Sequence, residues 1–161
     1  MYLDGNTPEL LRKEEICTLN NSNYVMVELP MSHIPEYTKV ILYNICLLGY
    51  TPIIAHPERN NEIMNNLDAL KSICDTGVLT QINSGSITQI YGRKVRNTAK
   101  KILKLGIASF VASDAHSIRT RAPRIIKASK ICNKICGCQK TKDLIISNGL
   151  AVINNESINY F

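Results

Sequence analysis

The sequence predicts an α/β fold in which parallel β-strands alternate with outer helices. Four short, apolar, β-branched segments recur along the chain, and each is followed by a polar loop and then by apolar residues at helical spacing. Three of the predicted helices are followed within two residues by a glycine, which is a common residue at the C-terminal end of a helix. This order is typical of βα units in parallel sheets and (β/α) barrels.

The predicted elements form four units, preceded by a helix over residues 8–15 with no strand before it. The strands are expected over residues 24–27, 52–55, 78–82 and 108–112. The helices that follow them are expected over residues 36–48, 61–75, 92–105, 123–136 and 141–147, with a polar tail from about 149. A closed barrel takes about eight strands. We therefore expect residues 1–161 to form a single, N-terminally incomplete domain, the C-terminal portion of a TIM-like barrel.

The composition is that of a globular protein with one core, since 45% of the 161 residues are hydrophobic. No apolar stretch approaches the ~20 residues of a membrane-spanning helix, so we expect no membrane insertion. The first five residues lack the basic and apolar regions of a secretory signal, which favours a cytoplasmic protein. Six cysteines without a signal peptide favour free thiols. The spacing of Cys132, Cys136 and Cys138 does not match structural zinc sites, and their role stays open.

The net charge of +6 raises the question of nucleic-acid binding. The Lys and Arg residues are spread over several predicted helices and do not form one stripe. The densest basic run, residues 93–104, also has apolar residues at helical spacing, so its cations are expected on the solvated face of an amphipathic helix. We therefore expect no nucleic-acid partner, although anionic phosphorylated partners would be attracted by the same positive field.

Four candidate metal ligands stand directly after predicted strands: Glu28, His56, Asp114 and His116. Taken singly, each is an ordinary loop residue that caps a helix or meets solvent. Together they supply the carboxylate and imidazole ligands that Zn²⁺, Mn²⁺ and Fe²⁺ prefer. The carboxyl ends of parallel strands are also where such folds place their active sites. Asp114 and His116 are two apart, and on an extended segment they would project to the same side.

Two arginines follow the candidate ligands, Arg59 three residues after His56 and Arg121 five after His116. A guanidinium matches phosphate oxygens in pairs, which favours phosphate-ester substrates, although each arginine alone could make a surface salt bridge. The segment 83–86 could cradle an anion but lacks the P-loop pattern. No cysteine has an arginine at the Cys-x5-Arg spacing, and no Gly-x-Ser-x-Gly elbow is present.

Four strings in this order resemble the PHP (polymerase and histidinol phosphatase) family of protein-tyrosine phosphatases encoded in bacterial capsule and exopolysaccharide clusters. The strings are Val27-Glu28-Leu29-Pro30, Ile54-Ala55-His56-Pro57-Glu58-Arg59-Asn60, Gln81-Ile82-Asn83-Ser84-Gly85-Ser86 and Ala112-Ser113-Asp114-Ala115-His116, with Arg121 after them. The resemblance covers about residues 15–128. It implies a distorted PHP-type barrel, up to three Mn²⁺ ions (Fe²⁺ or Zn²⁺ being alternatives), and hydrolysis of phosphotyrosine by a metal-bound hydroxide.

By the same resemblance, Glu28 and His56 ligate one metal, Asp114 ligates another, and His116 contributes to or supports the third, while Arg59 and Arg121 hold the phosphate. The implied substrate is a phosphotyrosine protein such as a bacterial polysaccharide tyrosine kinase. Family members also carry earlier metal ligands, including a His-x-His strand, that this chain lacks. Two alternatives therefore stay open: a non-catalytic remnant that binds metal or a partner, and a small-molecule phosphatase of the same fold.

Overall fold

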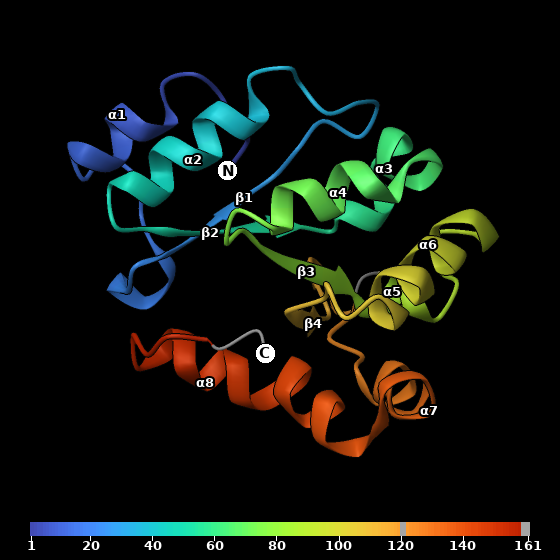
Figure 1. Cartoon of the computed structure of the whole chain (residues 1–161). Coiled ribbons are helices and arrows are strands. Elements are labelled where there is room, and N and C mark those ends of the chain that lie inside the picture. Colours follow the sequence, from blue (N-terminus) through green and yellow to red (C-terminus); the bar gives the residue numbers. More distant parts are fainter. Residues whose placement is uncertain (120–121, 159–161) are drawn as a thin grey trace.

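The computed structural model describes residues 1–119 and 122–158 and contains one parallel sheet (Figure 1). Its strands are β1 (Tyr24–Val27), β2 (Thr51–Ala55), β3 (Leu79–Asn83) and β4 (Phe110–Ala112), in the order β1-β2-β3-β4. All three neighbouring pairs are parallel, with Ile53 opposite Leu79 and Gln81 opposite Phe110. The predicted parallel strands with outer helices are confirmed, and the carboxyl ends of all four strands meet at one edge.

Helices cover both faces of this sheet. The α-helices are α1 (Thr7–Arg12), α2 (Thr38–Leu47), α3 (Asn61–Asn65), α4 (Leu67–Cys74), α5 (Ser84–Ile87), α6 (Arg93–Lys104), α7 (Ile126–Lys142) and α8 (Asn148–Ile153). Two 3₁₀ turns, η1 (Leu19–Asn21) and η2 (Pro57–Arg59), and a π-helical turn, η3 (Asp143–Ser147), complete the described elements. In Figure 1, α1, α2 and α4 lie on one side of the sheet and α8 lies on the other.

The core has two parts because successive strand residues point to opposite faces. Val25, Ile54, Ile82 and Val111 belong to the larger cluster, which includes buried residues of α1, α2, α4, α6 and α7. Tyr24, Ile53, Leu79 and Phe110 belong to the smaller cluster, where they are joined by Val152 of α8. Strands buried on both faces explain why their sequences read as continuous apolar runs.

Two predicted elements differ from the structure near the C-terminus. The polar tail expected from about residue 149 is wrong, since Asn148–Ile153 form α8 and Val152 is buried. The helices expected over residues 123–136 and 141–147 also merge. In the structure, α7 runs from Ile126 to Lys142 across a non-helical Gly137 and continues through η3 into α8.

Three further differences concern helices and the N-terminus. The helix expected over residues 61–75 is two helices, because Asn66 is extended (φ −139°, ψ 95°) and its side chain caps α4 by accepting from the Asp68 N–H. The loop expected over residues 83–86 contains α5. Tyr2 forms a parallel bridge with Glu28, so residues 1–3 pair with the outer edge at the end of β1, where no strand was expected. Among the described residues, no helix is long and apolar enough to cross a membrane.

Asn60 joins two loops at the carboxyl edge of the sheet. Its side-chain N–H groups donate to Pro30 O (2.7 Å) and His33 O (2.8 Å), and its Oδ1 caps α3 by accepting from the N–H groups of Glu62 and Ile63. The residue is 2% exposed. All four bonds depend on one buried amide, and they fix the segment after β1 against the turn after β2.

We predict that Asn60→Ala lowers the free energy of unfolding by about 1–3 kcal/mol, because it removes a helix cap and leaves two partly buried carbonyl groups without donors. Urea unfolding of the two proteins measures the difference. Asn97→Ala is the control, since Asn97 is exposed on α6 and alanine favours helix. A loss below about 0.5 kcal/mol for Asn60→Ala would show that the loops hold without this amide.

Candidate metal and phosphate site

The edge formed by the carboxyl ends of the strands positions the first two candidate ligands. Glu28 follows β1, and its backbone is fixed from outside by Met1 and Leu3: its N–H donates to Met1 O (2.7 Å) and its carbonyl accepts from Leu3 N (3.0 Å). His56 follows β2, and its N–H donates to Gln81 O of β3 (2.8 Å). Both residues therefore have a backbone that is held by neighbouring extended segments.

The side chains of Glu28 and His56 face each other. Glu28 Oε1 lies 3.7 Å from His56 Nε2, and the exposed fractions of the two side chains are 36% and 7%. Burial lowers the pKa of His56, and the positive charge of Arg59 acts in the same direction, while the carboxylates of Glu28 and Asp114 oppose the shift. The imidazole is thus favoured in its neutral form, which is the form that ligates metals.

Asp114 and His116 lie in the segment that follows β4. The Asp114 side chain is 17% exposed, and its Oδ2 accepts a 2.7 Å hydrogen bond from the side-chain amide of Asn83. His116 is 59% exposed, and its Nδ1 lies 2.9 Å from the Asp114 backbone oxygen and 3.7 Å from Asp114 Oδ1. The two residues do meet, but not because the segment is extended as expected, since Asp114 is left-handed with a φ of 50°.

Two candidate ligands have backbone conformations that residues other than glycine rarely adopt. The φ angles are 37° at His56 and 50° at Asp114. Such conformations cost about 1–3 kcal/mol each and cluster at functional sites, where the surrounding structure holds them in place. Here the His56 N–H to Gln81 bond and the Asn83 to Asp114 bond supply that support.

Arg59 ends the turn η2 and lies over an aromatic ring. Its Cζ atom is 4.5 Å from the centroid of the Tyr91 ring, a cation–π contact. The ring packs closely on Gly85 of α5, where an added Cβ would lie 2.9 Å from Tyr91 Cε2. The Tyr91 ring therefore orients Arg59, and the position of the ring depends on Gly85. Arg121, the other candidate phosphate ligand, lies outside the described residues.

Sequence reasoning missed the buried polar residues that connect these loops. Glu58 is fully buried, and its Oε1 accepts from Ser86 Oγ (2.5 Å) and from the Asn83 backbone N–H (3.1 Å). The side chain of Asn83 then reaches Asp114, so one polar chain links the turns after β2, β3 and β4. Asn83 ends β3, and the rule that polar strand ends form the site would have identified it. Nothing local in the sequence identifies Glu58.

The segment 83–86, considered as an anion cradle, uses its side chains internally. Ser86 Oγ donates to Glu58, and Ser84 Oγ donates to Arg124 O (2.7 Å). The cysteine cluster also gives no sign of a metal site. All six cysteines are free thiols, Cys136 Sγ donates to Cys132 O, and burial raises the pKa of Cys132 to about 12.

Glu58 makes the stability of the fold depend on pH. Burial raises its pKa from 4.5 to about 7, against the opposing effects of its hydrogen-bond donors and of Arg59. From about pH 4.5 to about 7 the unfolded chain has released this proton while the folded chain retains it, so rising pH lowers stability across that window.

We predict that Glu58→Gln, which cannot ionise, gains stability relative to the wild-type chain as pH rises from 5 to 8, by up to about 3 kcal/mol. Urea unfolding at several pH values measures this gap. Glu36→Gln, at an exposed position, is the control and should show no comparable trend. If the difference in unfolding free energy between Glu58→Gln and wild type is the same at every pH, Glu58 has the same pKa in the folded and the unfolded chain.

Comparisons with known proteins identify the family of this chain. Residues 1–154 match the family described as "Capsular polysaccharide synthesis, CpsB/CapC". The tyrosine-protein phosphatase YwqE of Bacillus subtilis (strain 168) is 32% identical over 154 residues, which cover 96% of this chain and 60% of YwqE. The tyrosine-protein phosphatase CpsB of Streptococcus pneumoniae is 35% identical over 163 residues, which cover 98% of this chain and 67% of CpsB. The chain thus spans less than two thirds of YwqE.

A solved structure gives the same result. It comes from a crystallographic study of YwqE from Bacillus subtilis and CpsB from Streptococcus pneumoniae, described there as metal-dependent tyrosine phosphatases. The TM-score is 0.94 at 32% identity, and the match covers 98% of this chain and 64% of that one. The resemblance inferred from the sequence motifs is confirmed, and the chain belongs to the CpsB/CapC family of capsular polysaccharide synthesis.

Proposed function

We propose that this chain carries part of the active site of a metal-dependent protein-tyrosine phosphatase that regulates capsular or exopolysaccharide synthesis. The observation that carries the proposal is the Glu28–His56 pair, 3.7 Å apart, with Arg59 in the turn that directly follows His56. A carboxylate, a neutral imidazole and a guanidinium at one sheet edge suit a metal ion and a phosphate ester together.

The donor set fits a divalent metal in type but not in number. Glu28 Oε1 and His56 Nε2 are too far apart for a hydrogen bond, and their separation is close to that of two ligands about 2.0–2.2 Å from one ion. Among residues 1–119 and 122–158, no three His, Cys, Asp or Glu side chains gather closely enough to hold an ion. We propose Glu28, His56, Asp114 and His116 as part of a ligand set for Mn²⁺, with Fe²⁺ or Zn²⁺ as alternatives.

The protein's own residues then have separable roles. When bound, a divalent metal supplies Lewis acidity, which activates water and offsets phosphoryl charge. Arg59 binds the phosphate oxygens through its planar N–H donors, and Tyr91 orients the guanidinium. Asn83 holds the Asp114 carboxylate by its 2.7 Å hydrogen bond, as a residue behind the ligands that limits their movement.

The names of the relatives support the substrate. YwqE and CpsB are tyrosine-protein phosphatases, and the family's description is capsular polysaccharide synthesis. We propose a phosphotyrosine protein as the substrate and a bacterial polysaccharide tyrosine kinase as the partner. The six free thiols agree with a reducing compartment such as the cytoplasm. Because the relatives are longer than the matched region, these remain proposals for the whole protein.

The proposal predicts Mn²⁺-dependent hydrolysis of p-nitrophenyl phosphate and of a phosphotyrosine peptide. Arg59→Ala should lower kcat/KM about 100-fold, because it removes charge stabilisation at the phosphate, while Arg12→Ala, on α1, should not. Asp114→Asn should weaken Mn²⁺ binding at least about tenfold by calorimetry, and Asp68→Asn, at an exposed position, is its control.

Other results would select the alternatives. Neither Mn²⁺ binding nor turnover by the folded chain would indicate a non-catalytic remnant. Faster hydrolysis of histidinol phosphate than of the phosphotyrosine peptide would instead indicate a small-molecule phosphatase of this fold.

The packing of Tyr91 gives a second prediction for the same site. Gly85→Ala should displace the Tyr91 ring from beneath Arg59, because the new Cβ would lie 2.9 Å from it, and should weaken inhibition by inorganic phosphate about tenfold. Tyr91→Phe keeps the ring and should change that inhibition less than about twofold. Gly149→Ala is the control, since its Cβ meets nothing within 4 Å. Unchanged inhibition in Gly85→Ala would show that Arg59 does not depend on the ring.

A further inference from the structure

The charges of the chain are strongly divided between its two halves. Residues 1–75 contain 5 of the 19 Lys and Arg residues and 10 of the 13 Asp and Glu residues. Residues 76–161 contain the other 14 cations and only 3 acidic residues. The net charge of +6 is therefore the sum of a negative first half and a strongly positive second half.

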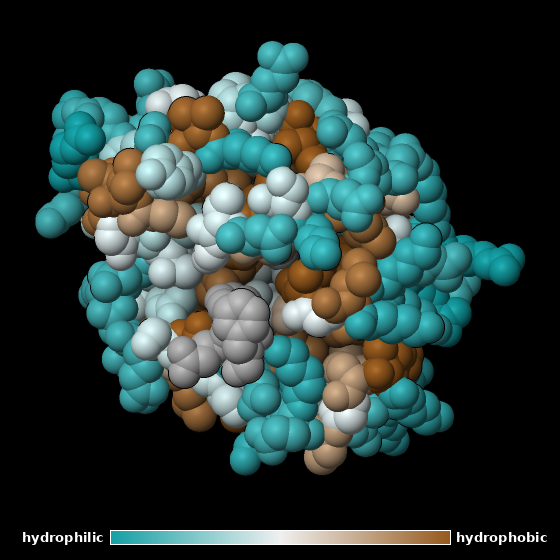
Figure 2. Space-filling view, in the orientation of Figure 1, coloured by the Kyte–Doolittle hydropathy of each residue, from teal (hydrophilic) through white to brown (hydrophobic). Residues whose placement is uncertain are grey.

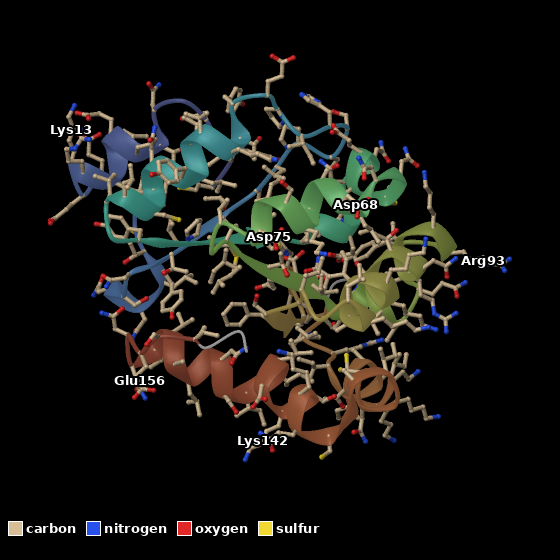
Figure 3. All side chains as sticks on the ribbon, viewed as in Figure 1. Lys13, Asp68, Asp75, Arg93, Lys142 and Glu156 are labelled. Atoms are coloured by element: carbon tan, nitrogen blue, oxygen red, sulfur yellow. The ribbon has the colours of Figure 1, made fainter. Side chains whose placement is uncertain are left out.

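Most cations of the positive half lie on two neighbouring helices. Helices α6 and α7 pack against each other, and together they contain 11 Lys and Arg residues and no Asp or Glu. Among the described residues, no salt bridge involves a cation of either helix. Hydrophilic side chains cover the side of the molecule where α6 lies (Figure 2), and Figure 3 shows Arg93 and Lys142 pointing away from the protein. The field of these helices is therefore not neutralised by neighbouring acids.

The first turn of α6 lies beside the candidate site. Helix α6 packs against the turn η2, which holds Arg59, and it begins two residues after Tyr91, which Arg59 covers. Two of its cations are anchored there: Lys94 Nζ donates to Asn65 Oδ1 of α3 (2.9 Å), and Arg96 Nη1 donates to Gln89 Oε1 (2.9 Å). Arg93 and Lys94 are exposed.

The start of α7 lies on another side of the same site. Arg124 is exposed, and its carbonyl accepts from Ser84 Oγ, the residue next to Asn83. Asn83 in turn binds Asp114. We call Arg93, Lys94, Arg96 and Arg124 the basic rim. The cations of the rim come from the first turn of α6 and from the segment just before α7, which border the edge where Glu28, His56 and Asp114 lie.

We propose that the basic rim binds acidic side chains that flank the phosphotyrosine, so that the substrate is an acidic phosphotyrosine segment of a protein. This inference rests on the proposed function, because the rim borders the phosphate-binding Arg59. A free phosphate group needs only that arginine and the metals. The unneutralised cations of the rim extend beyond the phosphate site, so they suit a ligand with further negative charges beside its phosphate. Opposite charges that pair at the rim of an interface mainly determine specificity and association rate.

The test uses two fluorescent peptides that carry a non-hydrolysable difluoromethylene phosphonate in place of phosphotyrosine. One peptide has Glu on both sides of the mimic, and the other has Gln. Anisotropy titration should give about tenfold tighter binding of the Glu peptide at about 50 mM salt, and this preference should shrink at about 0.5 M salt because exposed charges are screened.

Two double variants of α6 separate local contact from general attraction. Arg93→Gln with Lys94→Gln removes two cations next to the site, and Lys101→Gln with Lys104→Gln removes two from the last turn, about 13 Å along the helix. The first pair should lose about fivefold in affinity for the Glu peptide and little for the Gln peptide, while the second should lose less than about twofold. Circular dichroism and unfolding midpoints confirm that both variants fold.

Equal losses in the two variants would overturn the proposal, because they would indicate a general field without a rim. Tighter binding of a single-stranded DNA 20-mer through Arg93 and Lys94 would also overturn it in favour of nucleic acid. Turnover of p-nitrophenyl phosphate is measured beside the binding. Turnover without a preference for Glu would reject the rim alone, whereas a preference without turnover would reject the proposed function and support the rim as an acidic-peptide site.

Discussion

The buried carboxyl group of Glu58 is the interaction on which the geometry of the site depends. Its Oε1 accepts hydrogen bonds from Ser86 Oγ and from the Asn83 N–H. These two bonds connect the turn after β2 to the start of α5. Without these bonds, the backbone contact from this turn to β3 that remains near the ligands is His56 N–H to Gln81 O. Burying a carboxyl group is costly, and Glu58 Oε2 has no partner among the described residues. The group thus costs stability and holds His56 and Arg59 in place.

The same logic extends to the strained residues. Left-handed conformations at His56 and Asp114 turn the chain sharply at the ends of β2 and β4, which brings their side chains toward one edge of the sheet. Such conformations persist only where neighbouring groups determine them. Asn83 supplies that constraint twice, since its backbone binds Glu58 and its side chain binds Asp114. Its Oδ1 is buried without a described partner, a further polar cost in the same place.

The sequence was sufficient for features that depend on local patterns. Apolar β-branched runs identified all four strands, and Gly49 and Gly106 have the positive φ of helix ends, as expected. The rule that strand ends carry function placed Glu28 and His56 together. Features that depend on distant partners were missed. Pairing of Tyr2 with Glu28 joins segments far apart in sequence, and α8 is a short helix with Val152 as its one buried residue. No local pattern marks Glu58 as buried, because its partners lie 25 and 28 residues away.

The way in which Arg59 is held suits it to bind an anion. Among the described residues it takes part in no salt bridge, although Glu28 and Asp114 are nearby charges in the same site. An arginine paired with a carboxylate would have to break that pair before it bound phosphate, and the buried pair would resist. A cation–π contact with Tyr91 orients the guanidinium through its face and leaves the N–H donors at its edge available. Gly85 makes this arrangement possible, because any larger residue there would collide with the ring. The phosphate-binding group is thus positioned by apolar packing, while the candidate metal ligands are positioned by hydrogen bonds.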